Sequence, residues 1–251
     1  MAFTKTQGDN GVDSYIGTSG VDLITLEESA NIFLGAQKDD DRVNIQGSDG
    51  NASRYTLNGG AGNDTFNEHS SVRLTNSLLR SDDGNDTLTL AGLTSSTASG
   101  GDGLDTISTS SEMGSSLVNG NQSDDTININ AGASSSSIFG GIGQDAINLT
   151  TSIVSSTTRA NEGDDTITIA AGTTLNGSTV NGNQGNDLIT INQIASFIGS
   201  TIFGGIDNDT VNAATSAVGI VMNGDEGADN LTGGTATDTL TGGDGNDTFT
   251  G

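Results

Sequence analysis

Hydrophobic and polar residues alternate in short runs along most of this 251-residue chain. The runs DTININ at 125–130, DTITIA at 165–170 and DLITIN at 187–192 place isoleucine at every second position. A period of two is the pattern of a β-strand that buries one face and leaves the other in water. We therefore predict a short strand in each run, with Ile127 and Ile129, or Ile167 and Ile169, on the buried side.

A second, weaker apolar cluster lies before each glycine-rich segment. These clusters are Leu117–Val118, Ile138–Phe139, Val180, Ile202–Phe203 and Val221–Met222. With the alternating runs, they divide the chain into units of about 20 residues that we interpret as turn, strand, polar turn and strand. Such a unit predicts one coil of a flattened solenoid, because repeats of this length stack along one axis.

A ladder of aspartates marks the repeat. Nonamers resembling GGxGxD include NGGAGNDTF at 58–66, SGGDGLDTI at 99–107 and TGGDGNDTF at 241–249, and degenerate copies fill the gaps. Their aspartates are Asp13, Asp22, Asp41, Asp64, Asp86, Asp105, Asp125, Asp145, Asp165, Asp187, Asp209, Asp229, Asp238 and Asp247. The successive spacings are 9, 19, 23, 22, 19, 20, 20, 20, 22, 22, 20, 9 and 9 residues. The 9-residue steps predict that Asp13 and Asp238 lie on the edge opposite the main column.

Composition alone leaves two alternatives open. The chain has 38 glycines, no Trp, Pro or Cys, and only 31% apolar residues, too few for a conventional globular core. It is either disordered or builds a narrow core by repetition. The regular spacing favours repetition, since stacked coils bury a continuous column of aliphatic side chains that no coil could bury alone. The predicted fold is all-β, a parallel β-solenoid of about twelve coils.

The chain is strongly acidic, with 32 Asp and Glu against 7 Lys and Arg and a formal net charge of −25. Such a surface repels nucleic acid and anionic membranes and attracts cations, so we expect no nucleic-acid partner. No apolar run approaches the ~20 residues that cross a bilayer. The N-terminal residues lack the basic segment and apolar stretch of a Sec signal peptide, which predicts another export route.

No group of residues predicts catalysis. His69 is the single histidine, and neither a GxSxG elbow nor a histidine-based zinc motif occurs. Paired acids such as Asp124 and Asp125 repeat along a rod edge, whereas glycosidase carboxylates flank a cleft. We predict that the chain is not an enzyme and has no catalytic residues.

The glycine-rich turns predict a metal site. Their backbone needs positive φ, which Gly adopts at little cost and Asn or Asp at a modest one; Asn121, Asn161, Asn183 and Asp225 replace the second glycine. Such turns direct carbonyl oxygens inward, beside the aspartates of adjacent coils. A cage of about six oxygens suits Ca²⁺ better than the smaller Mg²⁺. Folding should then depend on metal, because the ion offsets repulsion along the aspartate ladder.

The motif GGxGxD followed by a hydrophobic residue resembles the RTX (repeats-in-toxin) hemolysin-type calcium-binding repeat. The resemblance covers nearly the whole chain and implies a β-roll-like solenoid, secretion by a type I route, and a surface or S-layer-like protein. It also implies on the order of ten Ca²⁺ ions bound by the aspartates of the turns. The implied ligands are Asp22, Asp41, Asp64, Asp86, Asp105, Asp125, Asp145, Asp165, Asp187, Asp209, Asp229 and Asp247.

Two departures from the family pattern shape the expected organisation. Most coils carry the motif on one edge only, so we expect calcium-binding turns mainly along one edge, in place of two. The chain ends in a repeat, GGDGNDTFTG, where a type I secretion signal would follow, which suggests a fragment or a different export route. We expect residues 1–57 to form irregular N-terminal coils that serve as an anchoring or assembly end, and residues 58–251 to form the regular solenoid.

The favoured function is a non-catalytic extracellular structural protein, a calcium-stabilised solenoid that self-assembles into a surface layer, filament or virion appendage. Its expected partner is itself, head to tail or side by side, and further partners are a cell-surface glycan or other envelope or virion proteins. Two alternatives remain open. One is an adhesin or ice-binding module, and the other is the calcium-dependent tail of a secreted hydrolase or toxin.

Overall fold

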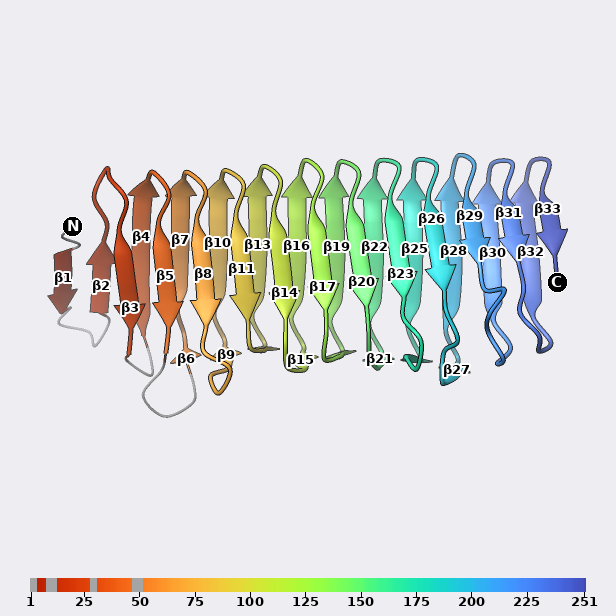
Figure 1. Cartoon of the computed structure of the whole chain (residues 1–251), viewed down its shortest axis with the longest axis horizontal. Coiled ribbons are helices and arrows are strands. Elements are labelled where there is room, and N and C mark those ends of the chain that lie inside the picture. The colour runs from red at the N-terminus through yellow and green to blue at the C-terminus, as the bar shows by residue number, and fades with distance from the viewer. Residues whose placement is uncertain (1–3, 8–12, 28–30, 47–51) are drawn as a thin grey trace.

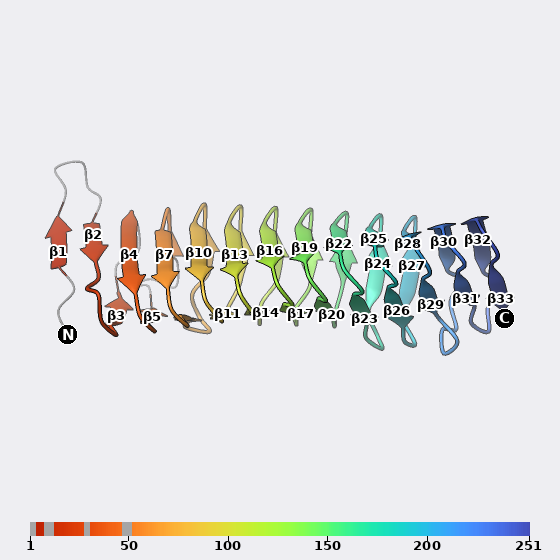
Figure 2. The ribbon, with the colours of Figure 1, turned by 90° about the horizontal axis from the view of Figure 1, so that it is seen from above.

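The protein is a stack of β-coils in the form of a long rod, and every described element of secondary structure is a strand (Figure 1, Figure 2). The computed structural model describes residues 4–7, 13–27, 31–46 and 52–251. Parts of the predicted N-terminal region 1–57 therefore lie outside the described residues. Among the described residues, no helix is long and apolar enough to cross a membrane.

Three sheets run along the rod, and each coil contributes one strand to the first two. The 13-stranded sheet consists of β1 (Thr4–Gln7), β2 (Asp13–Ile16), β4 (Ile32–Lys38), β7 (Thr56–Ala61), β10 (Leu78–Asp83), β13 (Thr97–Asp102), β16 (Leu117–Gln122), β19 (Ser137–Ile142), β22 (Thr157–Glu162), β25 (Thr179–Gln184), β28 (Thr201–Ile206), β30 (Val221–Glu226) and β32 (Thr239–Asp244). The 12-stranded sheet consists of β3 (Leu23–Leu26), β5 (Arg42–Ile45), β8 (Thr65–Glu68), β11 (Thr87–Leu90), β14 (Thr106–Thr109), β17 (Thr126–Ile129), β20 (Ala146–Leu149), β23 (Thr166–Ile169), β26 (Leu188–Ile191), β29 (Thr210–Asn212), β31 (Asn230–Thr232) and β33 (Thr248–Thr250).

The third sheet is an addition that the sequence pattern did not predict. Its strands are two or three residues long and lie on the lower edge of the rod in Figure 1. They are β6 (Ala52–Ser53), β9 (Leu74–Thr75), β12 (Leu93–Thr94), β15 (Met113–Gly114), β18 (Ala133–Ser134), β21 (Ile153–Val154), β24 (Thr174–Asn176) and β27 (Ser196–Ile198). We predicted only a polar turn there. The strand forms because one apolar side chain, such as Met113 or Ile153, closes that end of the core.

The prediction of a parallel β-solenoid of about twelve coils with about 20 residues each is confirmed. Neighbouring strands are parallel and pair in register, as in Ile127↔Ile147 and Val118↔Ile138. The exception is β1, which pairs antiparallel with β2. Parallel pairing follows from the coil geometry, because each turn of the solenoid returns the chain to its starting direction one strand further along the axis.

A thin aliphatic core runs between the sheets. Ile127, Ile129, Ile167 and Ile169 are fully buried, and so is Val118 from the weaker clusters, as the alternation predicted. Equivalent residues lie directly above one another, which gives one contiguous cluster along the rod. Each coil therefore packs mainly against its two neighbours.

Coil length varies on one side of the rod only. From Ser136 to Asp145 the chain advances nine residues. The residue equivalent to Ser136 in every other coil also lies nine residues before the next aspartate of the ladder, from Asp13–Asp22 at one end to Asp238–Asp247 at the other. The return half, which contains the short third strand, takes eleven residues from Asp145 to Ser156 and thirteen from Asp165 to Ser178. All the irregularity of the aspartate spacing thus arises in the return half.

A candidate calcium-binding edge

The tight turns that join the 13-stranded sheet to the 12-stranded sheet line up along the upper edge of the rod in Figure 1. Eleven of the twelve turns contain two residues with positive φ, for example Gly141 at 140° and Gly143 at 138°, and the exception is the first turn, between β2 and β3. At the first of these positions Asn121, Asn161, Asn183 and Asp225 have φ between 75° and 91°. These are the residues that we expected to replace the second glycine, so that prediction is confirmed.

Twelve aspartates follow these turns, one in each coil, and we name them the aspartate column. The structure stacks Asp22, Asp41, Asp64, Asp86, Asp105, Asp125, Asp145, Asp165, Asp187, Asp209, Asp229 and Asp247. All except Asp247 are buried, with at most 2% of their surface exposed. The degenerate copies at Asp41 and Asp145 take the same position as the clear ones. The column thus places every predicted ligand on one edge.

From Asp41 onward, one carboxylate oxygen of each column aspartate accepts a hydrogen bond from the backbone N–H of the column aspartate in the preceding coil. The backbone N–H of Asp125 donates to Oδ1 of Asp145 at 2.8 Å, and the N–H of Asp145 donates to Oδ1 of Asp165 at 2.7 Å. Eleven such bonds of 2.6–3.1 Å link the twelve aspartates. The column is therefore part of the scaffold, beyond any role in binding metal.

The second carboxylate oxygen has no partner. Oδ2 is buried and accepts no hydrogen bond in ten members of the column, Asp41, Asp64, Asp86, Asp105, Asp125, Asp145, Asp165, Asp187, Asp209 and Asp229. A buried carboxylate oxygen that accepts no hydrogen bond destabilises the folded state, because nothing replaces the water that it has lost. A regular row of ten such atoms indicates that a positive charge belongs beside them.

Backbone carbonyl oxygens supply further ligands next to these atoms. Oδ2 of Asp105 and the carbonyl oxygen of Gly120 both lie against the Cα of Gly100, where a Cβ would collide with them. The same pair of oxygens recurs at Gly120, Gly140, Gly182, Gly204 and Gly224. Two acceptors side by side, one of them anionic, suit a hard cation such as Ca²⁺.

Carboxylates alone do not form a cage. Within the described part of the chain, no group of three or more His, Cys, Asp and Glu side chains is placed to hold a metal ion. Each site would therefore combine a column carboxylate with carbonyl oxygens of the turns. The residues fit a calcium ion of this kind, and when bound it would neutralise the column. The assignment of these aspartates as ligands stays a prediction.

Burial raises the pKa of the ten column carboxyls from Asp41 to Asp229, because a buried carboxylate loses its hydration. The pKa reaches about 8 at Asp125 and Asp209 and about 7 at Asp105, Asp165 and Asp187. Backbone N–H donors lower these values, and neighbouring aspartates raise them further. Without calcium, burial therefore shifts the titration of these carboxyls from the acid range toward neutral pH.

The opposite edge carries a neutral counterpart that the sequence analysis missed. Seven buried serines form a serine column there, in which each backbone N–H donates to the hydroxyl of the next coil. Its members are Ser77, Ser96, Ser116, Ser136, Ser156, Ser178 and Ser200, joined by bonds of 3.0–3.2 Å that begin at the N–H of Tyr55. Each hydroxyl also donates to a carbonyl oxygen two residues earlier, as Ser136 does to Ser134 at 2.8 Å.

Aspartate occupies this row near the C-terminal end of the stack. The N–H of Ile220 donates to Oδ1 of Asp238, in place of a serine hydroxyl, and Oδ2 of Asp238 accepts the N–H of Gly234. At the other end, Asp13 pairs with Ile32 in the same row. The prediction that Asp13 and Asp238 lie on the opposite edge is confirmed. The serine spacing of 19, 20 and 22 residues, equal to that of the aspartates, was the signal that could have revealed the column.

Glu68 is a further buried carboxyl outside the aspartate column. It lies in an inward row of aliphatic residues, beside Ile45 of the preceding coil, and its Oε2 accepts the N–H of Ala91 at 2.7 Å and of Gly92 at 3.3 Å. Burial raises its pKa to about 7. The ring Nδ1 of His69, the single histidine, forms a hydrogen bond with the hydroxyl of Ser71 at 2.8 Å.

Comparison with known families supports the motif assignment. The model of the RTX calcium-binding nonapeptide repeat (4 copies) matches residues 7–41, 56–67 and 223–251. The coils between the second and third of these segments continue the same aspartate column without a break. Neither the curated proteins nor the solved structures give a match. The chain therefore carries RTX-type calcium-binding nonapeptide repeats in these three segments of the solenoid.

Proposed function

We propose that this chain is a non-catalytic extracellular structural protein, a calcium-stabilised rod that assembles with further copies into a surface layer, filament or virion appendage. RTX repeats bind Ca²⁺ and typically form non-catalytic parts of secreted proteins. The ten unpartnered Oδ2 atoms of the aspartate column carry the proposal. They give calcium a direct part in stabilising every regular coil.

The expected affinity agrees with an extracellular setting. Calcium sites become tighter as more charged ligands surround the ion, and extracellular modules work at about 10⁻⁴–10⁻³ M. Here each coil offers one column carboxylate, with carbonyl oxygens as the neighbouring ligands. Such sites would fill in calcium-rich surroundings and empty in a calcium-poor cytosol, so the rod would gain its full stability outside the cell.

The assembly part of the proposal rests on the stacking of similar coils. Each coil pairs in register with the next through both large sheets, as β31 does with β33. A coil of a second copy offers the same strands, so two rods can join by the pairing that already holds one rod together.

Calcium titration tests the proposal in two steps. We expect circular dichroism to show a cooperative gain of β-structure or thermal stability with Ca²⁺ in the millimolar range, and electron microscopy to show filaments or sheets only with Ca²⁺. The variant Asp145→Asn should bind fewer ions, whereas Asp83→Asn, at an exposed turn position, should bind as the parent does. If the chain is as stable in EDTA as in calcium, the proposed stabilisation by calcium is wrong. A calcium-loaded chain that stays monomeric would remove the assembly role alone.

A further inference from the structure

A polar groove runs along the outer face of the 13-stranded sheet. One stretch, with a cavity volume of about 610 Å³, crosses β25, β28, β30 and β32. A second stretch, of about 460 Å³, crosses β16, β19, β22 and β25. Asn183 and Gln184 line both, so the two stretches form one trough that crosses seven coils. The trough follows the long axis of the rod, perpendicular to the strands.

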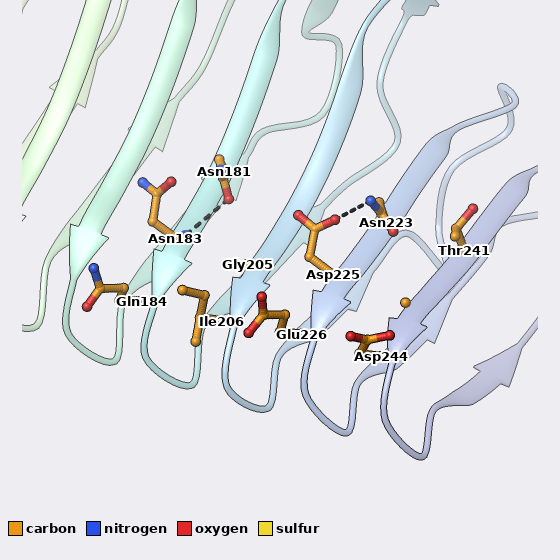
Figure 3. Close-up of a pocket in the computed structure, with 11 residues that line it drawn as sticks. Asn181, Asn183, Gln184, Gly205, Ile206, Asn223, Asp225, Glu226, Thr241 and Asp244 are labelled. Atoms are coloured by element: carbon orange, nitrogen blue, oxygen red, sulfur yellow. Dashed lines mark hydrogen bonds between the residues drawn. The ribbon is translucent and has the colours of Figure 1, made fainter.

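The trough is built from the same row in every coil. The second glycine position of the motif, where φ is positive, supplies Asn121, Asn161, Asn183 and Asp225, with Gly141 and Gly205 between them. These side chains point outward, away from the aspartate column. Figure 3 shows Asn183 on β25 and Asp225 on β30, with Gly205 of β28 between them, and Gln184, Glu226 and Asp244 along the rim of the trough.

The lining is rich in side-chain amides, which both donate and accept hydrogen bonds. Asn and Gln each carry two donors and an acceptor with two lone pairs, a set that matches neighbouring hydroxyl groups. Some amides pair with each other, as Asn183 Nδ2 does with Asn161 Oδ1 at 3.3 Å. The amide of Gln184, which lines both stretches, is exposed to solvent. The trough thus retains capacity for hydrogen bonds to a ligand.

Aromatic surface and charge narrow the class of ligand. The ring of Phe139 lies in the second stretch, with the guanidinium of Arg159 5.9 Å from its centre. Four acids line the trough, Glu162, Asp225, Glu226 and Asp244, and they outnumber the single cation Arg159, which lies between Phe139 and Asn181 in the same row. This charge would repel a polyanion. The coil spacing of about 4.8 Å is close to the length of one sugar ring in an extended glycan.

From these observations we infer that the trough binds a linear polysaccharide without carboxylate or sulfate groups, laid along the rod axis with about one sugar per coil. Amides would hold the hydroxyl groups, and Phe139 would pack against a sugar face. The acids at the C-terminal end would favour amino sugars there. The inference is independent of calcium binding and of self-assembly, and it would give a structural rod a means of attachment to a glycan surface.

A binding assay on the calcium-loaded full chain tests the inference. The probes are cellohexaose, xylohexaose, maltohexaose, chitohexaose and chitosan hexamer, with oligogalacturonate as the anionic control. We expect at least one neutral or amino hexamer to bind, and its dimer to bind at least tenfold more weakly, because a dimer spans fewer coils. The variants Asn161→Gly and Asn183→Gly remove amides without backbone strain, since Gly141 and Gly205 occupy the same row.

Each variant should weaken binding of that hexamer at least tenfold and leave the calcium-loaded melting temperature unchanged. Thr166→Ala, on the outer face of the 12-stranded sheet, should not alter binding. Absence of binding by all neutral and amino hexamers overturns the inference. So does binding of the anionic probe alone, or binding that the two Gly variants leave intact.

Discussion

The backbone N–H of Ser116 donates to the hydroxyl of Ser136 at 3.1 Å, in the next coil of the stack. On the opposite edge the N–H of Asp125 makes the same bond to a carboxylate oxygen of Asp145 at 2.8 Å. The two edges thus share one hydrogen-bond geometry, in which the acceptor is a hydroxyl on one edge and a carboxylate on the other. A serine hydroxyl accepts this bond and donates another, so it is satisfied without metal. An ionised aspartate only accepts, and its second oxygen is left over.

Replacing Ser136 by Ala should destabilise the rod to the same extent with and without calcium. The change leaves the N–H of Ser116 without an acceptor in a buried position. The expected loss is about 1–3 kcal/mol in the free energy of unfolding. Urea denaturation in EDTA and in millimolar Ca²⁺ would measure it. A loss confined to the calcium-free state would show that the two edges are coupled through the ion.

Replacing Asp145 by Asn should raise the free energy of unfolding in EDTA and lower the stabilisation that calcium provides. Asn keeps an oxygen that accepts the N–H of Asp125 but removes a buried charge. We expect a higher free energy of unfolding in EDTA at pH 8, because repulsion within the column falls. In calcium the stabilisation gained from the ion should fall, since one anionic ligand is missing. Calorimetry should count at least one ion fewer; an unchanged count would exclude Asp145 as a ligand.

The calcium-free rod should lose stability as the pH rises from about 4 to about 8. An unfolded aspartate titrates near 3.9, whereas burial raises the folded pKa to about 6 at Asp145 and about 8 at Asp125. Between these values the folded chain binds more protons than the unfolded chain, so its free energy of unfolding decreases with pH. Denaturation in calcium-free buffer at pH 5 and pH 8 would measure the difference. Saturating Ca²⁺ should restore stability at pH 8, and a calcium-free rod more stable at pH 8 than at pH 5 would contradict the prediction.

Replacing Glu68 by Gln should stabilise the rod above pH 7 and have little effect at pH 5. The Gln side-chain oxygen can still accept the N–H of Ala91 and of Gly92. Burial raises the pKa of Glu68 from 4.5 to about 7, so the loss of stability caused by its ionisation builds up between these two pH values and is complete above pH 7. Thermal denaturation at both pH values would test this. Glu68→Leu is the control, since it removes the acceptor and should destabilise the rod at either pH.

A two-residue insertion should cost little stability in the variable half of a coil and much more in the nine-residue half. Gly-Ser inserted after Gly132 lengthens the return from Asp125 to Ser136 from eleven residues to thirteen, the length already found between Asp165 and Ser178. We expect a cost below about 1 kcal/mol, because modest loop extensions are cheap. The same insertion after Ile142 would break the nine-residue step to Asp145. It should remove cooperative unfolding of the neighbouring coils; equal effects of both insertions would contradict the distinction.

The coil architecture could be predicted because its strongest determinants are periodic. Ile127 and Ile129 alternate with polar residues, and the aspartates recur at nearly constant spacing, so both the strands and the column follow from local pattern. The third sheet could not be predicted in this way. A strand such as Ala133–Ser134 is too short to show alternation, and it forms only because neighbouring coils hold it in place.

Only part of the candidate site could be predicted from the sequence. The motif locates Asp125 and Asp145 on one edge, but a motif does not say which oxygen meets a backbone N–H and which is left free. Ser136 was missed because serine is common in loops, and only stacking shows that its hydroxyl is buried. Glu68 was missed because a single acid in an alternating run looks like an outward residue, whereas its position in the strand faces inward.

The nine-residue half of each coil has a consequence for how such a protein can diversify. One side of the rod keeps a fixed count from the serine column to the aspartate column, while the other side accepts segments of different length. New loops can therefore be displayed at regular intervals along one flank without disturbing the opposite flank. The rod is in this sense a display scaffold, on which a lineage or a designer could vary the presented sequence coil by coil.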